Sequence, residues 1–167
     1  MEINQAACTF TGHREEKLPW KSNENDPHCI RLKELISDSV ESVYRSGIRH
    51  FICGMATGGD MYFCEAVMAL RASHEGITLE AAIPYERQSE GWPEALKKRY
   101  ARLVADCDYY TLVQKGYSPD CMMRRNRYMV DNASVLIAAY GGKPGGTMNT
   151  LLYALRRGLE IIELPIE

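Results

Sequence analysis

The sequence predicts an α/β fold in which a mainly parallel sheet carries helices on both faces. Two observations predict it. Short strand-like runs alternate along the chain with segments of helical periodicity, and several of these runs are continuously apolar, as buried parallel strands are. The 167 residues suit a single domain, 1–167, that is long enough to bury a core.

Six strands and five helices are expected. The strand-like runs lie at 6–11, 49–53, 78–83, 109–113, 134–140 and 160–164. Apolar residues at three- and four-residue spacing predict helices around 32–43, 62–70, 92–104, 122–129 and 151–155, the first ended by Gly47 and the last by Gly158. The polar segment 15–27 is interpreted as an ordered loop or flap.

Composition and charge exclude several classes of protein. The formal net charge is −2, which does not indicate a nucleic-acid surface or a membrane patch. No apolar run approaches the roughly 18 residues that span a bilayer, and the N-terminus does not resemble a secretory signal. The cysteines, at 8, 29, 53, 64, 107 and 121, form no CxxC pair. We therefore expect a reduced, cytoplasmic protein without a bound metal.

The residues that directly follow the strands carry the functional signal, because parallel strands end at one edge of their sheet and ligands bind there. These segments are 11–14, 54–60, 84–87 and 141–147. The last reads Gly-Gly-Lys-Pro-Gly-Gly-Thr and leads into a helix. A glycine turn before a helix exposes backbone N–H groups that attract phosphate, with Gly145, Gly146 and Thr147 as the expected contacts. The alternative is a tight turn without a ligand.

The second glycine-rich segment, 54–60, opens another helix. Gly54, Gly58 and Gly59 suit a second backbone cradle, and Asp60 is expected at the N-cap of the helix. Asp60 or Thr57 would then reach a ribose hydroxyl, whereas the alternative is capping alone. The segment is neither a Walker A loop nor a dinucleotide fingerprint.

Gly12 and four further side chains are candidates at this edge. Gly12 and Arg14 leave the first strand, and the planar guanidinium of Arg14 suits a phosphate unless it pairs with a neighbouring glutamate. His13 is a candidate proton carrier, although simple loop packing is the stronger interpretation. Among the arginines at 124, 125 and 127, Arg125 is expected to turn toward the site. Tyr85 is a weak candidate for stacking on a base.

These motifs together resemble the YpsA-like family of the SLOG superfamily, which also contains the lonely-guy phosphoribohydrolases and DNA-processing protein A. The resemblance rests on 11–14, 54–60, 125–131 and 145–147, and covers nearly the whole chain. It implies a Rossmann-like fold and a pocket for a nucleotide or nucleotide-derived ligand. The lonely-guy signature places an arginine on Arg125 and a glutamate on Thr150. Because threonine has no carboxylate, hydrolysis by that mechanism would require Glu65 or Glu86 instead.

The leading hypothesis is therefore binding or sensing of a nucleotide-derived ligand at the carboxyl edge of the sheet, with no cofactor required. The expected ligand contacts are Gly12, Arg14, Gly54, Thr57, Gly58, Gly59, Asp60, Arg125, Gly145, Gly146 and Thr147. One alternative is a nucleoside 5′-monophosphate N-glycosidase that uses a relocated carboxylate, with Glu65, Glu86 and His13 as weak catalytic candidates. A second is single-stranded nucleic-acid binding, which the net charge of −2 disfavours. The resemblance also suggests a homodimer.

Overall fold

The computed structural model describes residues 6–166 and contains one six-stranded sheet in the order β4-β3-β2-β1-β5-β6. The strands are β1 (Ala7–Thr11), β2 (His50–Cys53), β3 (Thr78–Ile83), β4 (Tyr109–Leu112), β5 (Val135–Ala139) and β6 (Glu160–Leu164). All neighbouring strands are parallel. This Rossmann-like architecture confirms the predicted fold class, and the strands lie where the apolar runs predict them.

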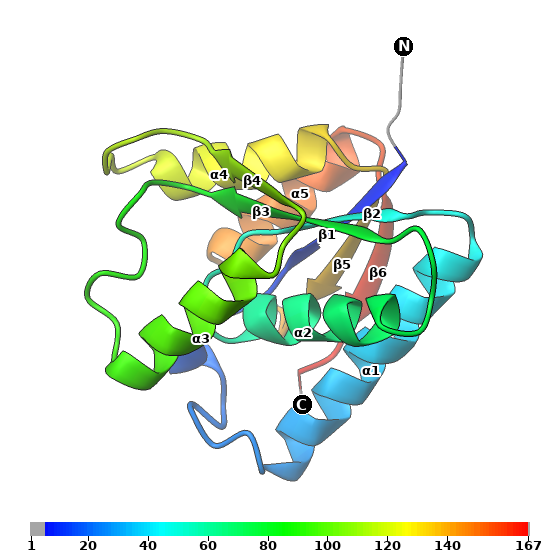
Figure 1. The fold of residues 1–167 in the computed structure, drawn as a ribbon, viewed down its shortest axis with the longest axis horizontal. Helices are drawn as coiled ribbons and strands as arrows, with labels where there is room; N and C mark the ends of the chain where they lie inside the picture. The colour runs from blue at the N-terminus through cyan, green and yellow to red at the C-terminus, as the bar shows by residue number, and fades with distance from the viewer. Residues whose placement is uncertain (1–5, 167) are drawn as a thin grey trace.

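Helices cover both faces of the sheet (Figure 1). The helices are α1 (Pro27–Arg45), α2 (Gly59–Arg71), α3 (Glu94–Ala105), α4 (Cys121–Asp131) and α5 (Gly146–Arg156). Helices α1, α2 and α3 lie on one face, and α4 and α5 lie on the other. Since successive side chains of a strand point to opposite faces, Ile137 of β5 packs in the core beneath α1 and α2, while Leu136 packs with Leu151 of α5.

The core beneath α1 and α2 contains the large aromatic side chains. Phe10 of β1 stacks on Phe63 of α2, with ring centroids 5.1 Å apart, and both rings are almost fully buried. The ring of Phe10 also constrains the backbone that leaves β1, because a Cβ on Gly12 would lie 2.8 Å from it. The packing of one buried ring thus requires a glycine at the start of the predicted site.

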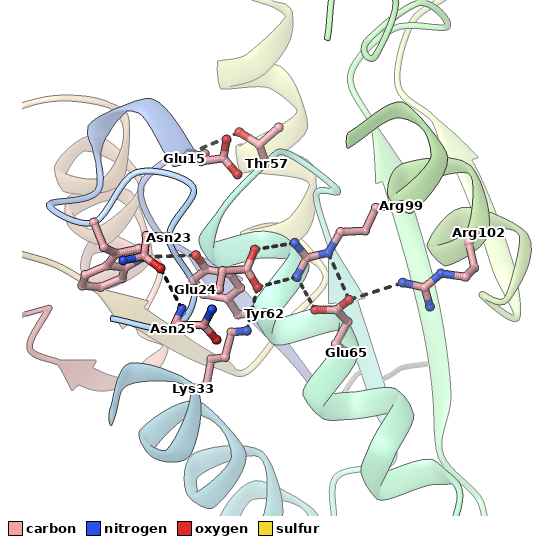
Figure 2. Close-up of polar contacts among 11 residues, drawn as sticks. Glu15, Asn23, Glu24, Asn25, Lys33, Thr57, Tyr62, Glu65, Arg99 and Arg102 are labelled. Atoms are coloured by element: carbon pink, nitrogen blue, oxygen red, sulfur yellow. Dashed lines mark hydrogen bonds and ion pairs between the residues drawn. The ribbon is translucent and has the colours of Figure 1, made fainter. Parts of the chain in front are cut away.

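The segment between β1 and α1 is an ordered loop, as predicted. It contains the short 3-10 helix η1 (Glu15–Lys17), and it buries Leu18 and Trp20. The indole Nε1 of Trp20 donates to the hydroxyl of Tyr62 at 3.1 Å. Figure 2 shows the second anchor, where Glu24 forms ion pairs with Lys33 and Arg99. These contacts hold the loop against α1, α2 and α3.

Within residues 6–166, each helix is too short or too polar to cross a lipid bilayer.

Candidate functional site

A cleft of about 310 Å³, here called the central cleft, lies beyond the carboxyl ends of β1 and β5. These two strands are neighbours in the sheet, but the chain leaves β1 toward β2 on one side and reaches β6 from β5 on the other. Loops that diverge at such a switch point leave a crevice between them, which is the usual ligand site of an open α/β sheet. The cleft is lined by Phe10, Thr11, Gly12, His13, Arg14, Glu16, Lys17, Ala56, Asp60, Met122, Arg125, Asn126, Met129, Gly146 and Thr147.

Most residues predicted from the separate motifs meet in this cleft. Gly12 and Arg14 come from the loop after β1, Asp60 from α2, and Arg125 from α4. Gly146 and Thr147 are contributed by the first turn of α5 and complete the wall. Segments more than one hundred residues apart in the sequence therefore form one concave surface.

Two further clefts open from the central one. The lysine cleft, of about 460 Å³, shares His13, Lys17 and Gly146 with it. Lys21 and Lys143 also line the lysine cleft, as does Gly145. The aromatic cleft, of about 340 Å³, shares Arg14, Glu16, Ala56 and Met122 with the central cleft and is further lined by Glu15, Thr57, Tyr85, Gln88, Trp92, Pro93 and Leu96.

The glycines of 54–60 lie behind the cleft wall instead of facing a ligand. Gly58 has a φ of 76°, and a Cβ added there would lie 2.7 Å from the backbone oxygen of His13. The N–H of Gly59 donates to that same oxygen at 3.1 Å. Thr57 is also engaged, because its hydroxyl accepts from the backbone N–H of Glu15 at 3.2 Å (Figure 2). These residues dock the β1 loop onto the start of α2.

Arg125 is buried, with 4% of its surface exposed, and its guanidinium donates through Nη1 to the carbonyl oxygen of Gly54. A Cβ on Gly54 would lie 2.7 Å from Nη1, so this position must be glycine for the guanidinium to fit. The Nε of Arg125 donates to the side chain of Asn126 at 2.9 Å. Burial lowers the pKa of Arg125, and the nearby Asp60 carboxylate opposes that change. The guanidinium of Arg125 therefore holds the backbone at the end of β2, and the same side chain also lines the central cleft.

The structure corrects the prediction that Asp60 is an N-cap. Gly58 occupies that position, α2 begins at Gly59, and the Asp60 carboxylate accepts from the backbone N–H of Ala56 at 3.0 Å. Asp60 is 7% exposed, and burial raises its pKa although Arg125 and the Ala56 N–H lower it. The carboxyl group thus closes the turn that precedes the helix and reaches the wall of the central cleft.

The 141–147 segment has the open geometry expected of a ligand-binding turn. Gly145 is the N-cap of α5, and its φ of 147° favours glycine. A Cβ on Gly142, Gly145 or Gly146 would meet no other heavy atom within 4 Å among the described residues. Thr150 donates its hydroxyl to the carbonyl of Gly146 at 2.9 Å. Space for a ligand therefore lies directly beside the first turn of α5.

His13 lies where the central and lysine clefts meet. Burial lowers its pKa, and the positive charges of Lys17 and Lys143 lower it further. A neutral imidazole is therefore favoured near pH 7.

The two glutamates considered as relocated catalytic groups lie outside the central cleft. Figure 2 shows Glu65 on α2 turned toward α3, where it pairs with Arg99 at 2.6 Å and with Arg102 at 3.5 Å. Glu86 is exposed, and its backbone N–H donates to Lys115. The carboxylates that do line the cleft are those of Glu16 and Asp60. Geometry thus corrects the expectation that Glu65 or Glu86 reaches the site.

The sequence interpretation missed several residues of the cleft. Met122 and Met129 lie on α4 three and four residues from Arg125, so helical periodicity applied to Arg125 would have found them, whereas the adjacent Asn126 follows from no such spacing. Glu16 and Lys17 carry no such signal, because the path of the loop after β1 decides where they lie. The same holds for Gln88 in the aromatic cleft.

The sequence matches the model of the YpsA family, described as the YspA SLOG family, over residues 8–160. The SPbeta prophage-derived protein YoqJ of Bacillus subtilis is 30% identical over 142 residues, which cover 77% of this chain and 83% of YoqJ. A UPF0398 protein of Halalkalibacterium halodurans is 24% identical over 152 residues, covering 89% of this chain and 80% of that protein.

Two solved structures share the fold. DNA processing protein A from Streptococcus pneumoniae superposes with a TM-score of 0.61 at 14% identity, covering 95% of this chain and 50% of that one. DNA processing protein A from Helicobacter pylori, whose structure was described for its single-stranded DNA binding mode, gives a TM-score of 0.65 at 15% identity. This chain is covered to 96% in that superposition and spans 66% of the Helicobacter chain, so it corresponds to only part of either protein.

Proposed function

This chain belongs to the YspA SLOG family, and on that premise we propose that it binds a nucleotide or nucleotide-derived ligand in the central cleft. The observation that carries the proposal is the convergence of Arg14, Arg125 and the first turn of α5 on one cleft at the switch point of the sheet. Ligands of open α/β sheets bind at this position. The adjoining lysine and aromatic clefts provide room for more than a lone phosphate.

We assign the phosphate to Arg14 and the first turn of α5. Arg14 is exposed and lines the cleft, and its planar guanidinium suits two phosphate oxygens. The open turn at Gly145 and Gly146 lets an anion approach the N–H groups at the positive end of the helix. Arg125 contributes positive charge to the wall of the cleft. Its Nη1 is already engaged, because it donates to the carbonyl oxygen of Gly54.

Titration calorimetry with nucleoside mono- and diphosphates, ADP-ribose, NAD and ribose 5-phosphate tests the proposal. Arg14→Ala should weaken the binding of a phosphate-bearing ligand at least tenfold, since a charge-assisted hydrogen bond contributes about 1.5–3 kcal/mol. Arg31→Ala is the matched control, because Arg31 is an exposed arginine of α1 whose partner is Glu34. Absence of binding by the unmodified protein at millimolar concentrations of every ligand would overturn the proposal.

A second candidate is binding of single-stranded nucleic acid, and the lysine cleft favours it. Lys17, Lys21 and Lys143 line a groove that continues from the central cleft and could follow a phosphate backbone. The fold shared with the DNA-binding protein of Helicobacter pylori supports the same candidate. Fluorescence anisotropy of a labelled oligonucleotide should then show affinity that falls steeply with salt and in Lys143→Ala. A salt-independent signal, or none, would exclude it.

Turnover of a nucleoside monophosphate is the third candidate. It rests on Asp60, because its carboxyl group is one of the two that line the cleft and proton transfer to a leaving base needs such a group. Release of free base, followed by chromatography, should then be lost in Asp60→Asn and retained in Glu65→Gln. If AMP binds and no base is released over hours, the site is a binding site only.

A further inference from the structure

Gln88 is the buried side chain in residues 6–166 with an oxygen that has no hydrogen-bond partner. The residue is 4% exposed, and its Oε1 is fully buried without a donor in reach. Its Nε2 lies 3.5 Å from the carbonyl oxygens of both Gly54 and Met55. Exchanging the two amide atoms would place Oε1 against those carbonyl oxygens, so the hydrogen-bond network favours this orientation and the unpaired group is then an acceptor.

An unpaired acceptor in the interior is costly, and buried polar groups in folded proteins nearly always have a partner. Gln88 is part of the wall of the aromatic cleft, which adjoins the central cleft through Arg14, Ala56 and Met122. A donor that enters the aromatic cleft would therefore approach this side chain. The feature indicates a ligand that brings an N–H or O–H group.

The rest of the aromatic cleft suits a flat, apolar group. Tyr85 packs edge-on against Tyr117 with ring centroids 5.4 Å apart, and Trp92 packs edge-on against Tyr100 at 5.3 Å. Such contacts fix the two rings that line the cleft. Aromatic side chains held in this way stack on nucleobases with little regard to which base is present.

From these observations we infer that the aromatic cleft is the nucleobase subsite and that Gln88 selects a base with an exocyclic amino group. The inference rests on the proposed function, since the phosphate in the central cleft would place the base. The ribose would lie between them, near Ala56 and Met122, which line both clefts. Stacking on Tyr85 and Trp92 would hold the ring, and the amino group would donate to Oε1 of Gln88. Because Oε1 is fully buried, this contact requires the cleft wall to open on binding.

Two ligand pairs test this selectivity, because the members of each pair differ in one exocyclic amino group. They are AMP with purine riboside 5′-monophosphate, and GMP with IMP. Calorimetry should give at least tenfold tighter binding of the amino member in one pair or both. Equal affinity within both pairs would overturn the inference.

Two variants separate the contributions. Gln88→Met keeps the length of the side chain and removes the acceptor, so it should abolish the difference within the pair while leaving the melting temperature equal or higher. Trp92→Ala should weaken both members by the same factor, because stacking does not sense the amino group. Retention of the full preference in folded Gln88→Met would overturn the assignment to Gln88.

Ribose 5-phosphate distinguishes the failure of this inference from the failure of the proposed function. If ribose 5-phosphate binds and all four nucleotides bind equally, the phosphate site stands and the base subsite is wrong. If neither ribose 5-phosphate nor any of the four nucleotides binds, the proposed function itself fails and the base subsite fails with it.

Discussion

Residues 54–60 and residues 141–147 both follow a buried strand, both contain a glycine pair, and both lead into a helix. In the first segment, Cβ atoms on Gly54 and Gly58 would collide with Arg125 and with the backbone of the β1 loop. In the second, Cβ atoms on Gly145 and Gly146 would meet open space among the described residues. The same sequence signal thus serves internal packing in one segment and leaves access for a ligand in the other.

The largest expected effect on this comparison comes from Gly58→Ala. The new Cβ would meet the backbone of His13 and Glu15 at 2.7 Å and would also occupy a positive φ, so we expect a loss of about 3 kcal/mol or more in the free energy of unfolding. Gly47→Ala is the control, since Gly47 also has a positive φ but no heavy atom near its Cβ, and it should cost about 1 kcal/mol. Equal losses in urea denaturation would show that crowding at Gly58 is unimportant.

The next effect concerns Gly54 and Arg125, whose interaction energy a double-mutant cycle measures. Arg125→Ala removes a buried guanidinium from the Gly54 carbonyl and should cost about 3 kcal/mol, and Gly54→Ala alone should cost about 2 kcal/mol because of the clash at 2.7 Å. Without the guanidinium, the added Cβ has room. The double variant should therefore be less destabilised than the sum by about 1–2 kcal/mol. Simple additivity would mean that the contact does not determine the glycine.

A smaller effect is expected from Asp60→Asn, and it depends on pH. Burial raises the pKa of Asp60, so the folded protein binds this proton more tightly than the unfolded chain does. The stability that this group contributes is complete below its unfolded pKa, about 4, and is lost as the pH rises through the raised folded pKa. As the pH increases over that window, the free energy of unfolding of Asp60→Asn should therefore rise relative to that of the unmodified protein. A difference that is constant with pH would contradict the shift.

The smallest effect on stability is expected from Gly146→Ala, at the open segment. Gly146 lies in the first turn of α5 without a positive φ and with no neighbour near its Cβ, so the free energy of unfolding should change by less than about 0.5 kcal/mol. The same Cβ would fill the approach to the helix N-terminus, and binding of a phosphate ligand should weaken at least tenfold. Unchanged affinity in calorimetry would remove 141–147 from the proposed site.

Acid stability probes Glu80 of β3, which lines none of the three clefts. Burial alone would raise the pKa of Glu80, but hydrogen bonds from His50, Tyr128 and Thr111 outweigh it and hold the pKa below its usual value. Stability from Glu80 is therefore present above its unfolded pKa and is lost as the pH falls through the lowered one.

The sequence by itself determined the parallel sheet, its helices and the edge at which the motifs gather. Runs such as 135–139 and periodic segments such as 32–43 are local patterns, and burial of apolar side chains depends directly on them. Because parallel strands share one carboxyl edge, it also followed that Arg14 and Thr147 lie at the same end of the molecule, and Arg125 was predicted there from the arginine run that precedes β5.

Only the tertiary structure decided which of those residues face the cleft. The path of the loop after β1 covers Gly58 and brings Lys17 to the wall, and ion pairs with Arg99 and Arg102 hold Glu65 on the face of α2 toward α3. Gln88 has no sequence signal at all, because an unpaired acceptor exists only once its surroundings are assembled. Contacts between distant segments depend on the packed geometry of both partners, which no local pattern of residues contains.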